Sequence, residues 1–139
     1  MQDDINYEIV KFANSDELID LYTEGGWWKE SPLERGNLPT LIKNSFCFMV
    51  ARTNEGKIVG MGRVISDGVS DGYIQDVIIS KLYRNKGIGK QLVIKLRDYC
   101  LSKGLSWIAL IAEPGTTDFY VKLGFSEMMD YKPMILNSK

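Results

Sequence analysis

The most constraining feature of the sequence is a segment that begins as an apolar strand, passes through a loop with two glycines and enters a helix. It covers residues 76–90 and reads DVIISKLYRNKGIGK. Backbone N–H groups at the start of a helix attract anions, and the helix dipole strengthens that attraction. Gly87 and Gly89 let a phosphate approach the backbone closely. The segment therefore predicts a site for a phosphate or pyrophosphate group, next to basic side chains at Arg84, Lys86 and Lys90.

Length and composition fit one globular domain over residues 1–139. Apolar residues make up 45% and charged residues 25% of the chain, close to globular averages, which excludes a disordered protein. The acidic first residues lack the apolar region of a signal peptide, and no apolar run is long enough to span a membrane. We therefore expect a cytoplasmic protein without membrane contact.

Charge and residue types exclude several classes of function. The 17 basic and 18 acidic residues give a net charge of −1, whereas nucleic-acid-binding domains are usually strongly basic. The chain has no His, which removes His triads and His metal sites. Cys47 and Cys100 form no Cys-x-x-Cys pair, so we expect no metal. Neither thiol has a partner that would activate it, and we interpret both as buried small hydrophobic residues.

Hydrophobic patterning predicts an α/β fold with a mixed sheet. The predicted strands cover residues 7–12, 46–52, 57–66, 73–79, 106–112, 125–129 and 132–136. The predicted helices cover a segment capped by Asn14 and ended by Gly25, a short segment from Pro39 to Lys43, a long segment ended by Gly104, and residues 116–123. A helix joins the fourth and fifth strands, so these two strands should be parallel neighbours.

Two spaced motifs indicate a family. The loop lacks the glycine patterns of the common nucleotide-binding motifs. Residues 84–89, RNKGIG, instead match the pattern Q/R-x-x-G-x-G/A, and residues 119–125 read FYVKLGF about 30 residues later. With an apolar strand before the loop and an amphipathic helix after it, the sequence resembles the GNAT N-acetyltransferase superfamily. The resemblance covers nearly the whole chain.

Within that superfamily, residues 60–68 and 74–77 resemble a small bacterial branch, which is similar to arylalkylamine-type acetyltransferases of plants and bacteria. One position departs from the pattern. Many family members carry Asn seven residues before the tyrosine of the second motif, and this chain has Glu113 there. We therefore do not assign to Glu113 the cofactor contact that this Asn makes in the family.

The resemblance implies a mixed, mostly antiparallel sheet of six to seven strands with a central parallel pair splayed apart, flanked by about four helices. It implies acetyl-CoA as co-substrate, without a metal, and a primary amine of a small molecule or a protein as acceptor. It also allows a homodimer, because dimers are common in the superfamily. The alternative function is a non-catalytic sensor or regulatory module that binds acyl-CoA.

By the same resemblance, the loop would hold the pyrophosphate of acetyl-CoA and the strand before it would pair with the pantetheine arm. An N–H near Ile78 would polarise the thioester carbonyl. The predicted cofactor contacts are Val77, Ile78, Ile79, Arg84, Asn85, Lys86, Gly87, Ile88, Gly89 and Lys90.

Tyr120 is the candidate general acid, because its O–H could protonate the departing thiolate. Its alternative role is packing beside Phe119. Asp76 is the candidate base, because an alkylammonium must lose a proton before it attacks, and it could instead bind the cation or cap the end of the strand. Gln75 should face away from Asp76 in a regular strand unless a bulge intervenes.

Tyr22, Trp27 and Trp28 lie where this family places acceptor-site loops. Adjacent Trp residues could form a wall for an aromatic or cationic amine, or they could pack on the core. Arg63 could meet an acidic group of the substrate or form a structural salt bridge. With Gln75, these are the predicted acceptor-site residues.

Overall fold

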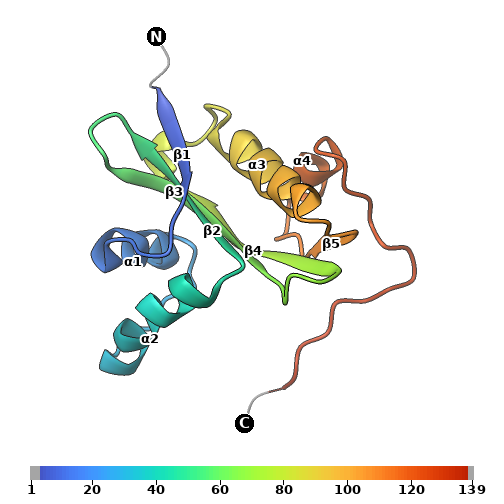
Figure 1. The fold of residues 1–139 in the computed structure, drawn as a ribbon, viewed down its shortest axis with the longest axis horizontal. Coiled ribbons are helices and arrows are strands. Elements are labelled where there is room, and N and C mark those ends of the chain that lie inside the picture. The colour runs from blue at the N-terminus through green and yellow to red at the C-terminus, as the bar shows by residue number, and fades with distance from the viewer. Residues whose placement is uncertain (1–3, 138–139) are drawn as a thin grey trace.

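A five-stranded sheet organises residues 4–137, the part of the chain that this computed structural model describes (Figure 1). The strands are β1 (Ile5–Ile9), β2 (Cys47–Thr53), β3 (Ile58–Ile65), β4 (Asp71–Ile79) and β5 (Trp107–Leu110), in that order across the sheet. The helices are α1 (Ser15–Glu24), α2 (Pro32–Asn44), α3 (Ile88–Ser102) and α4 (Thr117–Val121), with a 3-10 turn, η1 (Lys81–Tyr83), before α3. Figure 1 shows α1 and α2 on one face of the sheet and α3 on the other.

Strand β2 is apolar from Cys47 to Ala51 because helices cover both faces of the sheet. Side chains alternate between the two faces of a strand. Phe48 and Val50 enter the cluster beneath α1 and α2, whereas Cys47 and Met49 enter the cluster beneath α3. The strand therefore contributes to both halves of the core, which explains its continuous hydrophobic run.

Helices α1 and α2 begin at side-chain caps. Asn14 accepts a hydrogen bond from the Glu17 N–H at 3.1 Å and starts α1 as predicted. The prediction of a short helix from Pro39 to Lys43 is wrong, because α2 begins at Pro32 and holds Pro39 in its interior. Ser31 accepts a hydrogen bond from the Glu34 N–H at 3.0 Å, and a proline is favoured in the first helical position. None of the helices in residues 4–137 is long and apolar enough to cross a membrane.

The pairing of β4 changes along its length. Its first half pairs parallel with β5, from Asp71 opposite Trp107 to Ile74 opposite Leu110, which confirms the predicted parallel pair. Beyond Ile74 the two strands part. On its other side β4 pairs antiparallel with β3, and the register shifts between Met61 and Arg63. Two residues of β4 there oppose one of β3, which is a β-bulge.

Close approach of α3 to the sheet depends on Gly62 in β3. A Cβ atom on Gly62 would lie 2.8 Å from Cδ1 of Leu96 in α3 and 3.2 Å from Cγ2 of Val77. Both distances are shorter than ordinary carbon contacts. The absence of a side chain at this position therefore lets α3 pack tightly where β4 and β5 separate.

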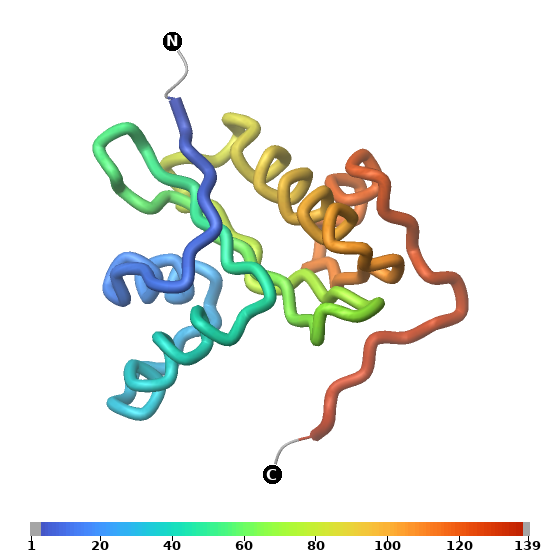
Figure 2. Tube along the Cα trace, in the orientation of Figure 1, coloured from blue at the N-terminus to red at the C-terminus, as the bar shows by residue number. Residues whose placement is uncertain are grey.

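The predicted strands over residues 125–129 and 132–136 are wrong. The fold class, with a mostly antiparallel sheet, one parallel pair and four helices, is confirmed, but the sheet has five strands where six to seven were predicted. After Gly124 the chain runs as an extended segment outside the sheet (Figure 2). A strand needs a hydrogen-bonded neighbour, and this segment has none within residues 4–137.

Candidate active site

A cleft of about 700 Å³ opens where β4 and β5 separate. Four parts of the chain form it: the end of α1 with Trp27, the second half of β4, the loop into α3, and the segment from Glu113 into α4. The residues that line it are Glu24, Gly25, Trp27, Val77, Ile78, Ile79, Tyr83, Arg84, Asn85, Gly87, Ile88, Gly89, Lys90, Glu113, Pro114, Gly115, Thr116, Phe119 and Tyr120.

The glycine loop forms one end of the cleft. Gly87 is the N-cap residue of α3, with φ at +80°, and no side chain caps the N–H groups that follow it. These groups lack intrahelical partners and can bind an anion. The guanidinium of Arg84 donates from Nε to the Ile79 carbonyl at 2.9 Å, which ties the loop to the end of β4. Lys90 lines the same end of the cleft.

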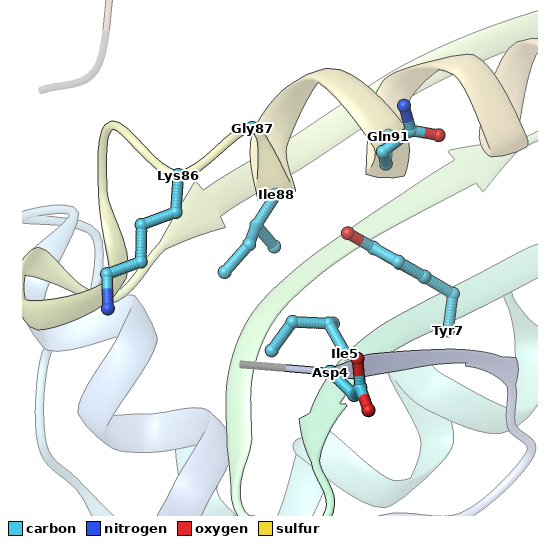
Figure 3. A pocket seen from close by; sticks show the side chains of 7 residues that line it. All are labelled: Asp4, Ile5, Tyr7, Lys86, Gly87, Ile88 and Gln91. Atoms are coloured by element: carbon cyan, nitrogen blue, oxygen red, sulfur yellow. The ribbon is translucent and has the colours of Figure 1, made fainter. Parts of the chain in front are cut away.

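Nine of the ten predicted cofactor contacts line this cleft, and Lys86 does not. Lys86 lines a smaller cavity of about 240 Å³ between β1 and the start of α3 (Figure 3). Its Nζ lies 5.3 Å from the centre of the Tyr83 ring, a cation–π distance. The loop thus directs its basic side chains to two different places, which the spacing of the motif did not indicate.

Tyr120 lies in α4 with its ring between two phenylalanines. The ring centres of Phe119 and Phe125 are 5.0 and 5.9 Å away, both edge-on. Within residues 4–137 the Tyr120 hydroxyl makes no hydrogen bond, and the side chain lines the cleft. Burial raises the pKa of Tyr120, and the negative charge of Glu113 raises it further. The hydroxyl therefore keeps its proton and has no acceptor among the described residues.

Asp76 lies at the bulge, with φ at 59°, and its carboxylate accepts two hydrogen bonds from the protein. Oδ2 accepts hydrogen bonds from the Tyr22 hydroxyl at 2.8 Å and from Arg63 Nε at 2.7 Å. Arg63 also donates from Nη2 to Oε1 of Gln75 at 3.2 Å. The bulge thus brings Gln75 and Asp76 to one arginine, which regular alternation would prevent.

This four-residue network is almost closed to solvent. The side chains of Arg63 and Asp76 are only 15% and 16% exposed, and Tyr22 is buried. Burial raises the pKa of Tyr22 above its ordinary value, and the Asp76 carboxylate adds to the rise. None of the four residues lines the cleft. The network therefore lies behind the cleft wall and fixes the strand that forms it.

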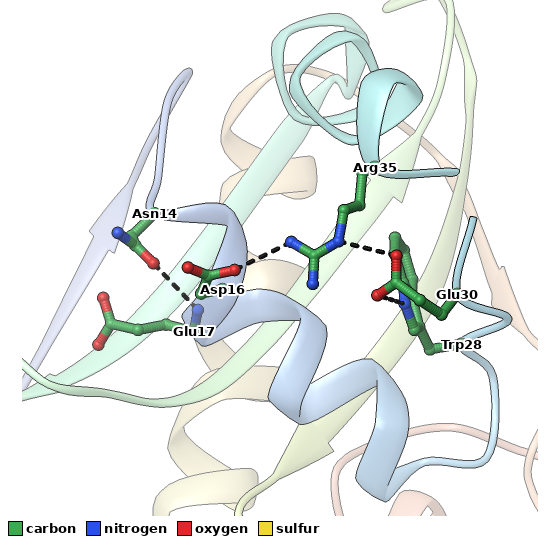
Figure 4. A network of polar contacts seen from close by, with 6 residues as sticks. All are labelled: Asn14, Asp16, Glu17, Trp28, Glu30 and Arg35. Atoms are coloured by element: carbon green, nitrogen blue, oxygen red, sulfur yellow. Dashed lines mark hydrogen bonds and ion pairs between the residues drawn. The ribbon is translucent and has the colours of Figure 1, made fainter. Parts of the chain in front are cut away.

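The two adjacent tryptophans point to different environments. Trp27 lines the cleft. Trp28 packs on the core cluster beneath α1, and its indole Nε1 donates to Glu30 at 3.2 Å. Arg35 of α2 then joins Glu30 to Asp16 at the start of α1 (Figure 4). Of the five predicted acceptor-site residues, only Trp27 reaches the cleft.

Several lining residues were not predicted from the sequence, above all Glu24, Gly25 and the segment from Pro114 to Thr116. Glu24 accepts a hydrogen bond from the Lys81 N–H at 3.0 Å, which joins the end of α1 to η1. These two residues lie 57 positions apart in the sequence. No local motif signals such a contact, since it exists only once α1 packs beside β4.

The two cysteines are far from nucleophilic. Both are fully buried in the cluster beneath α3, and neither lines the cleft. Burial raises the pKa of the Cys47 thiol to about 12, with a smaller contribution from Cys100. A thiol with such a pKa carries almost no thiolate near pH 7.

A scan of known families matches the Acetyltransferase (GNAT) family model over residues 11–125. One relative is the Arabidopsis thaliana protein named GCN5-related N-acetyltransferase 2, chloroplastic, which is 31% identical over 90% of this chain and 56% of its own length. Another is the N-acetyltransferase ycf52 of Pyropia yezoensis, described as uncharacterized, 33% identical over 88% of this chain and 70% of its own length. This chain thus spans little more than half of the chloroplast protein.

The fold also has a counterpart among solved structures. The Staphylococcus aureus protein SA2161, whose crystal structure is described as that of a "Probable Acetyltransferase", superposes with a TM-score of 0.82. The superposition covers 97% of this chain and 100% of that protein, at 20% sequence identity. At this identity the likeness shows a shared fold.

The raised pKa of Tyr22 predicts a loss of stability at alkaline pH. The unfolded chain ionises this tyrosine near pH 10, whereas the folded protein keeps it neutral to a higher pH. The stabilisation is thus complete below pH of about 10 and declines as the pH rises further. Above that pH, we expect the wild type to lose about 1.4 kcal/mol more per pH unit than Tyr22→Phe, in urea unfolding at a series of pH values. Equal slopes for the two proteins would contradict the prediction.

Proposed function

This chain belongs to the GNAT family of acetyltransferases, and on that premise we propose that it moves the acetyl group of acetyl-CoA directly to a primary amine. The observation that carries the proposal is the composition of the cleft. The cleft is lined both by the loop that leads into the uncapped N-terminus of α3 and by Tyr120, whose hydroxyl has no partner in the described chain. A thioester with a phosphate-bearing tail needs both features.

The cleft suits acetyl-CoA, the proposed acetyl donor, in two ways. The N–H groups at the start of α3 would receive the pyrophosphate, because Gly87 presents no side chain there and Arg84 and Lys90 supply charge. The pantetheine arm would extend along Val77–Ile79, where β4 has lost its β5 neighbour. An extended amide-bearing chain can replace a missing strand at such an edge. Lys86 faces the smaller cavity and would act on the phosphates only at longer range.

The chemistry needs one proton donor and no covalent intermediate between substrate and enzyme. The nitrogen of the neutral amine attacks the thioester carbonyl carbon, an amide bond forms, and the C–S bond breaks with its electron pair on sulfur. Tyr120 would give its proton to that sulfur. The proton lost by the amine nitrogen would then return to the Tyr120 oxygen through water. An N–H near Ile78 would stabilise the negative oxygen of the tetrahedral intermediate. The buried thiols of Cys47 and Cys100 support direct transfer without an acyl-enzyme.

Asp76 has a different role in this proposal from the base that the sequence indicated. Its Oδ2 is held by Arg63 and Tyr22, and the residue does not line the cleft. We assign Asp76 to positioning: its two contacts hold the bulge, and the bulge sets the direction of Val77 and Ile78. Deprotonation of the ammonium then falls to water.

The acceptor would enter beside Trp27. The aromatic face of this residue and the carboxylates of Glu24 and Glu113 line the cleft. Aromatic rings and carboxylates attract cations, which an alkylamine is before it loses its proton. We favour a small-molecule amine over a protein amine, since residues at the end of α1 and in α4 both line the cleft.

A thiol-release assay with acetyl-CoA and a panel of amines tests the proposal. Turnover with a small primary amine, and none without an amine, is the expected result. Tight binding of acetyl-CoA without release of thiol for any amine or basic peptide would favour the alternative, a CoA-binding sensor. Failure to bind acetyl-CoA at all would overturn both functions.

Gly87 and Gly104 form a matched pair for testing the phosphate assignment. Both have a left-handed φ, +80° and +84°, at opposite ends of α3, and a Cβ on either would meet no protein atom within 4 Å. Gly87→Ala and Gly104→Ala should therefore lose similar stability, about 1–2 kcal/mol each. Only Gly87→Ala should weaken acetyl-CoA binding in calorimetry, by about tenfold or more. Unchanged affinity in folded Gly87→Ala would refute the assignment.

Tyr120→Phe removes the hydroxyl and keeps the ring between Phe119 and Phe125. We expect kcat to fall about 10²–10⁴-fold, with acetyl-CoA affinity and the thermal midpoint nearly unchanged. Tyr99→Phe is the control, because Tyr99 packs on Phe46 away from the cleft and should keep full turnover. Near-normal kcat in Tyr120→Phe would reduce Tyr120 to a packing residue.

Asp76→Asn distinguishes the positioning role from the base. The amide loses the charge that binds Arg63 but keeps its size, so kcat should fall by a similar factor at every pH. The shape of the pH–rate profile should match that of the wild type. A loss concentrated at low pH, where the ammonium must be deprotonated, would restore Asp76 as the base.

A further inference from the structure

Helix α1 ends in a left-handed turn that leads Trp27 into the cleft wall. Gly26 has φ at +76°, a conformation that glycine adopts without strain. Its N–H donates to the Thr23 carbonyl at 3.0 Å, and the Trp27 N–H donates to the Tyr22 carbonyl at 3.0 Å. These two hydrogen bonds are those of a Schellman motif, with Gly26 as the left-handed residue. The end of α1 therefore fixes the point from which the Trp27 side chain extends.

Tyr22 supports the indole of Trp27 from the side of the helix. The centres of the two rings are 6.3 Å apart, and the rings meet edge-on at an angle of 67°. A hydrophobic contact between these two positions often accompanies this kind of helix end. Tyr22 is itself held in place, because its hydroxyl donates to Asp76 at 2.8 Å. The indole thus packs on a side chain that is tied to β4.

Gly25 leaves the space that the indole occupies. Its φ of −74° is one that any residue adopts. A Cβ atom there would nevertheless lie 2.8 Å from Cε3 and 2.9 Å from Cδ2 of Trp27, and 3.0 Å from Cδ1 of Ile78. All three distances are shorter than ordinary carbon contacts. The side chains of Trp27 and Ile78 therefore meet over Gly25, where glycine is needed for space and not for backbone conformation.

Trp27 keeps part of its ring available, in contrast to its neighbour. The indole of Trp28 packs on the core cluster beneath α1 and donates to Glu30. Trp27 is 39% exposed and lines the cleft. A tryptophan offers a large rigid apolar surface, and its ring face attracts cations. Trp27 is thus fixed on the protein side and open on the cleft side.

The acceptor would meet this indole beside the reacting carbonyl. That step rests on the proposed function, in which the thioester carbonyl lies near the N–H of Ile78. Because the indole lies beside the side chain of Ile78, the carbon chain of an attacking amine would lie against the indole. We propose that Trp27 selects the acceptor, favouring primary amines with an apolar chain of several carbons. Gly25 is the positioning residue that lets the indole take this place.

Steady-state kinetics with ethylamine and pentylamine test the proposal. The two amines share the reacting group, and pentylamine is longer by three methylene groups. Burial of these groups against the indole should give the wild type a kcat/KM for pentylamine at least about tenfold higher than for ethylamine. In Gly25→Ala the added methyl group displaces the indole, so the ratio should fall to about threefold or less. The loss should appear in KM for pentylamine, with kcat and acetyl-CoA affinity nearly unchanged.

Two further variants separate the indole from a general disturbance of the fold. Gly36→Ala is the matched control, because Gly36 lies inside α2 and a Cβ there would meet no atom within 4 Å. It should leave the ratio of the two amines unchanged. In a Trp27→Ala background, Gly25→Ala should lower the ratio no further, since the ring that it displaces is gone. Equal ratios in the wild type and Gly25→Ala, or additive losses in the double variant, would overturn the proposal.

The indole N–H signals in nuclear magnetic resonance give a readout that needs no turnover. The chain has three tryptophans, and Trp27→Phe identifies the signal of Trp27. Pentylamine added in the presence of CoA should shift this signal and leave those of Trp28 and Trp107 in place. A shift without thiol release for any amine would support the selection by Trp27 and overturn acetyl transfer. Thiol release from pentylamine without a shift would overturn the selection and leave acetyl transfer standing, and the absence of both would overturn both.

Discussion

The parting of β4 from β5 is the constraint on which the rest of the site depends. Parallel pairing ends at Ile74 and Leu110, and the cleft begins there. Every later feature uses the space that this break creates. Trp27, Tyr120 and the loop before α3 all line the cleft. Had the pairing continued, the backbone of Val77–Ile79 would be hydrogen-bonded to β5 and unable to receive a ligand.

The buried network behind the wall explains how the break is held in place. Asp76 has a positive φ, which costs a residue with a Cβ about 1–2 kcal/mol. Hydrogen bonds from Tyr22 and Arg63 to its carboxylate offset that strain and tie α1 and β3 to the bulge. Such a pair adds little net stability relative to apolar packing, but removal of one partner is strongly destabilising. The network therefore contributes mainly a single fixed geometry for the cleft wall.

The two cysteines and Tyr120 are titratable groups in different surroundings. Cys47 and Cys100 are enclosed in the core, where burial raises the pKa of each thiol and removes its reactivity. Tyr120 is half-buried at the cleft, where burial and Glu113 keep its proton in place while the hydroxyl has no acceptor in the described chain. The same physical effect, desolvation, makes the thiols unreactive and keeps Tyr120 protonated, as the proposed proton donation requires.

The sequence by itself determined the order of elements as far as α4, the parallel pair and the glycine loop that leads into α3, because each of these is written in local patterns along the chain. Alternation predicted β2, β3 and β4 within two residues, and nine of the ten residues predicted to contact the cofactor line the cleft. Tertiary structure alone decided the rest. Asp76 is paired and not free because a bulge turns it toward Arg63 and Tyr22, and Trp28 packs on the core while Trp27 lines the cleft. The segment from Lys132 to Leu136 has the pattern of a strand yet has no partner within its own described chain, since a strand exists only when another edge completes its hydrogen bonds.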